Sequence, residues 1–129
     1  MTRITSAIAF LLSVLHIGGC GDPIPPDMKM LKELSELRRL ETNYHMVHGR
    51  YARVEDIGGW ADFTRKRSSN GIDHGYDVVF ELTKTGYIVR ALPRLQKSHG
   101  IKSFYMDETG YVRYAFAPDA ATDHSPIWH

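Results

Sequence analysis

The chain has 129 residues, of which 110 remain from Cys20 onward, a length that suits one small domain and leaves no room for two. Hydrophobic residues make up 43% and charged residues 24% of the sequence, which argues against a disordered chain and against a membrane protein with several spans. Removing residues 1–19 removes Arg3 and no acidic residue, so 15 Lys and Arg then balance 15 Asp and Glu. Domains that bind nucleic acids normally carry a basic excess, so we expect no nucleic acid among the partners.

The N-terminus has the three parts of an export signal. Arg3 supplies a positive start, residues 7–15 are apolar except for Ser13, and two glycines precede Cys20. Even counted over residues 4–17, the apolar run is 14 residues long. A helix that spans a bilayer needs roughly 20. We therefore expect residues 1–19 to be a signal peptide that is removed.

Residues 17–20, IGGC, resemble the lipobox of bacterial lipoproteins, in which an aliphatic residue and two small residues precede an acylated cysteine. Cys20 is the only cysteine, so an internal disulfide is excluded, and an exported cysteine without a partner is a liability unless it is used covalently. The resemblance implies a palmitate-type lipid on Cys20. It also implies anchoring to the bacterial cell membrane or outer membrane, facing the periplasm or the surface. The alternative is a chance cysteine beside an ordinary cleavage site.

A long amphipathic helix is predicted over residues 28–48, after a Pro-rich tether at residues 20–27. Asp27 stands where an N-cap belongs, and Gly49 is placed to end the helix. Apolar residues recur every three or four positions: Leu31, Leu34, Leu37, Leu40, Tyr44 and Val47. The charged residues between them are assigned mostly to the solvated side: Lys32, Glu33, Glu36, Arg39 and Glu41.

After a stretch with at most a short helical turn at residues 54–57, the hydrophobic period changes to two. Two hairpins follow, with strands expected at residues 76–82, 87–92, 101–106 and 111–116. Gly86 and Gly110 are expected to take the left-handed conformation in the turns. Residues 117–129 form either a tail or a strap over the sheet edge. The fold class is α+β, with residues 28–129 as a single domain in which the helix packs on a four-stranded antiparallel meander.

Catalytic and metal-binding patterns are not recognisable in the sequence. His45 and His48 could share one helical face, but they provide two ligands where a zinc site needs three or four. Two Ser–His neighbour pairs, at residues 98–99 and 124–125, lie on extended chain and point apart. The carboxylate pairs at residues 55–56 and 107–108 are typical of turns. We expect no catalytic residues, no metal and no cofactor.

Residues 37–58, LRRLETNYHMVHGRYARVEDIG, resemble the end of the long helix and the following turn in type IV pilin-like proteins, including type II secretion pseudopilins. The matching residues are Asn43, Tyr44, Gly49, Tyr51, Val54, Asp56, Ile57 and Gly58. The stretches 75–93 and 102–115 resemble the sheet hairpins of the same head domains. The lipobox and Pro-rich tether replace the prepilin leader and apolar helix of that family, which argues against an ordinary filament subunit.

Three hypotheses of function follow. The resemblance implies a lipid-anchored structural or interaction module of the cell envelope, with protein partners there. Such a module could be an accessory of pilus or secretion machinery. The second hypothesis is a lipoprotein that binds a small molecule or peptide between helix and sheet. The third is a hydrolase whose residues are dispersed in the loops. A filled core between helix and sheet favours the first, a groove with convergent polar groups the second, and a buried charged cluster the third.

Overall fold

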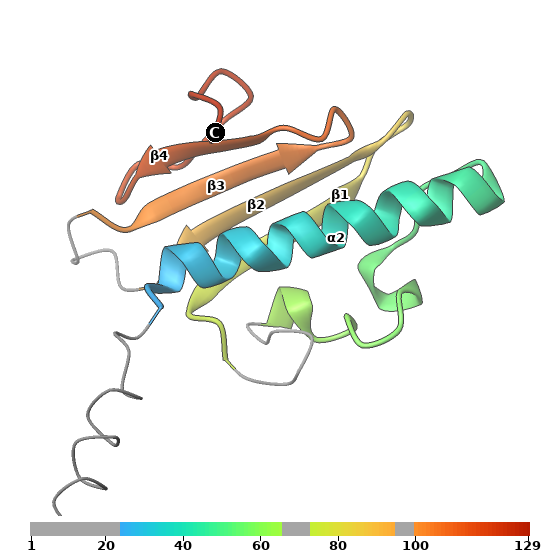
Figure 1. Ribbon diagram of the computed structural model, residues 1–129, viewed down its shortest axis with the longest axis horizontal. Helices are drawn as coiled ribbons and strands as arrows, with labels where there is room; N and C mark the ends of the chain where they lie inside the picture. The colour runs from blue at the N-terminus through green and yellow to red at the C-terminus, as the bar shows by residue number, and fades with distance from the viewer. Residues whose placement is uncertain (1–23, 66–72, 95–99) are drawn as a thin grey trace, which may run out of the picture.

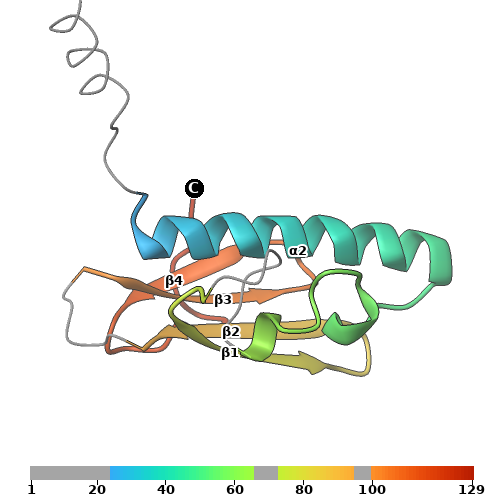
Figure 2. The same cartoon turned by 90° about the horizontal axis from the view of Figure 1, so that it is seen from below.

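The computed structural model describes residues 24–65, 73–94 and 100–129. One long helix, α2 (Pro26–His48), is followed by two short 3-10 turns, η1 (Val54–Asp56) and η2 (Phe63–Arg65). Four strands then form one antiparallel sheet in the order β1 (Tyr76–Leu82), β2 (Tyr87–Pro93), β3 (Lys102–Asp107) and β4 (Val112–Phe116). The helix lies across one face of the sheet, as Figures 1 and 2 show from two directions. The predicted α+β architecture, one helix on a four-stranded meander, is confirmed.

The helix begins two residues earlier than predicted. Pro25 is the N-cap and Pro26 the first helical residue, so the N-cap predicted at Asp27 is wrong. Proline is favoured at this position because its missing N–H would have no partner inside the helix. Asp27 instead lies in the first turn, where its negative charge suits the positive end of the helix dipole. The predicted end is confirmed, since Gly49 has a φ of 72° and donates its N–H to the His45 carbonyl.

The buried stripe of α2 is only partly the one predicted. Leu34 and Leu37 are fully buried, as expected, and Tyr44 is half-buried. Val47, which was expected on the apolar face, is 77% exposed. Glu41, which was assigned to the solvated side, is 0% exposed. The helix therefore buries a carboxyl group against the rest of the fold.

The two hairpins are confirmed, with strand ends within one residue of those predicted. The β1–β2 register pairs Leu82 with Tyr87, and the β3–β4 register pairs Met106 with Val112. Gly110 has the expected positive φ, 87°. Gly86 does not, so that expectation is wrong; its missing side chain instead leaves room for the Glu108 carboxylate, with which a Cβ would collide.

Residues 117–129 form a strap around the β4 edge, the second of the two predicted alternatives. Buried Ser103, on the sheet face away from the helix, donates its hydroxyl to the Asp119 carbonyl and accepts the Ala121 N–H. Farther along, Ile127 forms an antiparallel bridge with Arg113. The Trp128 ring then packs edge-on against Tyr114, whose ring centroid is 5.7 Å away. The strap thus contacts the outer sheet face, the edge and the helix-side face in turn.

The space between helix and sheet is filled by one hydrophobic core. Its fully buried members come from the helix, the segment after it and the sheet, and they include Met30, Leu34, Leu37, Phe63, Tyr76, Tyr87, Val89 and Met106. Burial of this kind contributes about 1.5 to 3 kcal/mol for each large side chain. Within the described residues, no helix has the length and apolar character to cross a bilayer.

Candidate functional site

A groove of about 450 Å³ is lined by residues at the end of α2 and in the β1–β2 turn. Figure 1 shows that these two segments lie at the end of the molecule opposite the start of α2. The end of α2, the segment after it and the β1–β2 turn form its walls. We call it the distal groove, and its lining residues are His45, Gly49, Arg50, Tyr51, Leu82, Thr83, Lys84, Thr85 and Gly86. Three separate segments of the chain therefore build this site.

Stacked rings line one wall of the distal groove. The left-handed residue Gly49 ends α2, and Tyr51 lies two residues beyond it against the helix end. The Tyr51 ring stacks on His45, with centroids 4.3 Å apart and planes 20° apart. Its other contact is edge-on to the buried Tyr87 of β2, at 5.2 Å. The Tyr51 ring therefore lies between His45 of α2 and Tyr87 of β2.

The charged side chains that line the distal groove are both cations, Arg50 and Lys84. The Arg50 guanidinium lies 5.4 Å from the centroid of the Tyr44 ring, a cation–π contact. Neither cation forms an ion pair with any residue that the structure describes. No carboxylate lines the groove, so its electrostatic potential favours an anionic group.

Exposed apolar side chains lie at the same end of the molecule as Arg50 and Lys84. Met46 and Val47, in the last turn of α2, are 78% and 77% exposed. Leu82, at the end of β1, is 44% exposed and lines the distal groove itself. Exposed apolar residues beside unpaired cations are characteristic of surfaces that contact other proteins.

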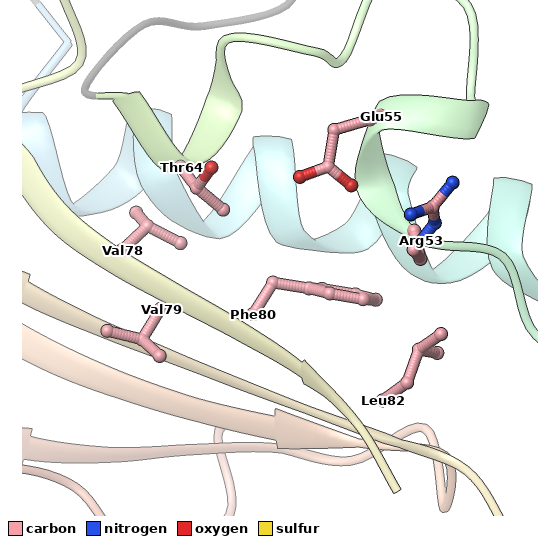
Figure 3. A pocket seen from close by; sticks show the side chains of 7 residues that line it. All are labelled: Arg53, Glu55, Thr64, Val78, Val79, Phe80 and Leu82. Carbon is pink, nitrogen blue, oxygen red and sulfur yellow. The ribbon is translucent and has the colours of Figure 1, made fainter.

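A second groove, of about 410 Å³, runs along β1 and shares Leu82 with the first. Figure 3 shows Arg53, Glu55 and Thr64 along one wall and Phe80 and Leu82 of β1 along the other. Arg53 is paired with Asp56, the Nε to Oδ2 distance being 3.3 Å. Because β1 is an edge strand, this groove extends the exposed surface from the distal end along the side of the sheet.

The two helix-end histidines do not converge. His45 stacks on Tyr51, whereas the His48 ring lies 4.1 Å from that of Tyr44. Over residues 24–65, 73–94 and 100–129, no three His, Cys, Asp or Glu side chains gather in a metal-binding arrangement. Cys20, the predicted lipid attachment site, lies outside the described residues.

The other pairs singled out in the sequence occupy turns. Asp56 accepts a hydrogen bond from Arg53, and Asp107 accepts the Thr109 N–H at 3.0 Å within the β3–β4 turn. In the strap, the Ser125 carbonyl accepts a hydrogen bond from Arg113, and His124 is exposed. The pair at residues 98–99 lies outside the described part of the chain.

Buried polar residues were not identified from the sequence. His74 accepts the Tyr76 N–H at Nδ1, so its Nε2 carries the hydrogen that is donated to the Phe63 carbonyl at 2.8 Å. This histidine therefore joins η2 to β1. Glu41 is different, because neither carboxyl oxygen has a hydrogen-bond partner in the structure as described. The sequence signal for this burial was the spacing of Glu41, which continues the three- and four-residue steps of the buried Leu34 and Leu37.

No protein-family model, curated protein or solved structure matches this chain. What the structure has in common with the pilin-like heads is the arrangement of one N-terminal helix on a four-stranded antiparallel sheet.

Proposed function

We propose that this chain is a lipid-anchored protein of the bacterial cell envelope, whose pilin-like head is an interaction module that binds a protein partner at the distal groove. The observation that carries the proposal is that the start of α2 and the distal groove lie at opposite ends of the molecule. The chain enters α2 at Pro26, and the distal groove is lined by His45 and Gly49 at the other end of this helix. A helix of 23 residues is about 35 Å long. An anchor on Cys20 would therefore present the groove away from its own membrane.

The chemistry of the groove defines the partner. Arg50 and Lys84 favour a segment with acidic side chains, and the nearby Met46, Val47 and Leu82 favour apolar residues in the same segment. The partner is thus an envelope protein with an exposed, acidic and partly apolar segment. The sequence resemblance to pilin-like proteins suggests that this partner is a component of pilus or secretion machinery.

The filled core supports this proposal over a ligand held between helix and sheet. Leu37, Tyr76 and Met106 meet there without exposed surface, and both grooves described above lie at the rim of the domain. A ligand between the layers would have to displace buried side chains.

Site-specific photocrosslinking in the cells that make the protein tests the proposal. A photoreactive residue at position 84 should capture an envelope protein, whereas the same residue at exposed position 29, near the start of α2, should not. Replacing Arg50 and Lys84 together with Glu should abolish a crosslink formed from position 46, because two attractive contacts become repulsive. The matched control replaces Lys29 and Lys32 with Glu and should leave that crosslink intact. Equal capture from positions 84 and 29, or capture that survives the Arg50 and Lys84 changes, would disprove the distal site.

A further inference from the structure

Glu41 is a buried acidic group without the partners that a buried charge requires. It is 0% exposed, and neither Oε1 nor Oε2 has a hydrogen-bond partner among the described residues. The backbone N–H of Ala52 favours the ionised form of the carboxyl, but it forms no hydrogen bond with either oxygen. An ionised carboxylate in such surroundings is strongly disfavoured relative to water, whereas a neutral carboxyl is much less so.

Within the described part of the chain, no cation forms an ion pair with Glu41. From the helix itself, Arg38 is turned outward to the Gly110 carbonyl at 2.8 Å, and His45 is stacked on Tyr51. From the segment after α2 and from β2, the titratable neighbours are the phenols Tyr51 and Tyr87. Asp107, at the end of β3, acts on Tyr87 with the same sign as an ionised Glu41 and offers no compensating charge.

Residues 50–53 are the part of this enclosure that can move at least cost. They form no helix or strand, whereas Glu41 and Tyr87 belong to regular elements. Opening would expose the buried Ala52 and break the ring contacts of Tyr51 with His45 and Tyr87. Lifting this segment would let water reach the carboxyl and leave α2 and the sheet in place.

We propose that Glu41 is a pH-sensitive latch between α2 and residues 50–53, closed when its carboxyl is protonated and opened when the carboxyl ionises. Burial raises the pKa of Glu41 from 4.5 to about 7, which places the change near neutral pH. Because the closed form has the higher pKa, it binds more protons than the open form between these values. The advantage of the closed form is therefore complete below about pH 4.5 and is lost as the pH rises through 7. The latch requires no partner, but Arg50 and Tyr51 also line the distal groove, so opening the latch would change the shape of that site.

Amide hydrogen exchange of the full chain at pH 5.5 and pH 8.5, corrected for the intrinsic exchange rate, tests the latch. With a pKa of about 7 closed and 4.5 open, protection of the amides of residues 51–54 should fall about thirtyfold between these pH values. Glu41→Gln, which keeps the shape without the charge, should remove this pH dependence. Glu33→Gln, on the same helix, should retain it.

Protection of residues 51–54 that does not change with pH, or the same fall in Glu41→Gln, would overturn the proposal. If Glu41→Gln does not fold, the wild-type carboxyl can be titrated directly by carbon NMR. A midpoint near 7 that coincides with the loss of protection supports the latch, and a midpoint near 4.5 rules it out.

Discussion

The Lys102 Nζ lies 3.3 Å from the Asp27 Oδ2, so that an ion pair joins β3 to the first turn of α2. The same ammonium group lies 5.1 Å from the Trp128 ring centroid and 5.3 Å from that of Phe116. Both charged side chains are mostly buried, at 19% and 11% exposure. One cation therefore fastens the helix start, the sheet and the strap together.

Replacing Lys102 with Met should lower the free energy of unfolding by about 2 kcal/mol. The change removes a partly buried ion pair and two cation–π contacts, and it leaves Asp27 without its partner. Denaturant melts give the value. The matched control is Arg39→Met, which breaks the solvent-exposed pair with Glu36 and should leave the midpoint nearly unchanged. Equal effects of the two substitutions would mean that burial adds nothing to the Lys102 pair.

Truncating Leu37 to Ala should lower the free energy of unfolding by about 2 to 5 kcal/mol, as in other buried leucine truncations. Leu37 is fully buried where the helix meets the sheet. The measurement is again a denaturant melt, with exposed Lys32→Ala as the control on the opposite side of α2. An unchanged midpoint for Leu37→Ala would show that the helix does not rest on the sheet.

Changing Gly49 to Ala should cost about 1 kcal/mol through backbone strain alone. The φ of 72° disfavours any residue with a Cβ, although no atom lies within 4 Å of where that Cβ would stand. Gly58→Ala is the matched control, because its site is equally open and its φ is not positive. Thermal melts of the two variants should therefore differ by several degrees. Two indistinguishable melting temperatures would contradict this account of the helix end.

Changing Cys20 to Ala should leave the protein soluble or as an unprocessed precursor, since acylation is its predicted hold on a membrane. Metabolic labelling with a palmitate analogue, followed by fractionation, provides the measurement. Label that persists in the variant, or a wild-type chain that is never labelled, would refute the lipoprotein interpretation.

The order of elements was predictable because local signals determine it, whereas the helix face was not. The series Leu31 to Leu40 advances in steps of three, and nine residues rotate a helix by about two and a half turns, so its ends lie on opposite sides. Met30 and Glu41, eleven residues apart, are nearly aligned, and both are buried. Hydrophobicity alone could not select this second series, because one of its members is an acid.

The distal groove was beyond sequence reasoning for a related reason. Arg50 and Lys84 are 34 positions apart, and only the pairing of β1 with β2 brings the Lys84 turn to the end of α2. Neither residue lies in a recognisable motif. Gly86 shows the same limit on a smaller scale, because the Glu108 side chain that occupies its space comes from the second hairpin.

The strap also determines how the order of the elements along the chain could be changed. Trp128 and Asp27 both contact Lys102, so the two ends of the described chain lie beside each other although 101 positions separate them. Neighbouring termini are what circular permutation requires. A short Gly-Ser linker from residue 129 to residue 24, with new termini opened between Glu108 and Gly110, would keep every strand pairing and move the free ends to the opposite pole. Such a permutant could carry a fused reporter beside the groove, and it would have no free chain end at the helix start.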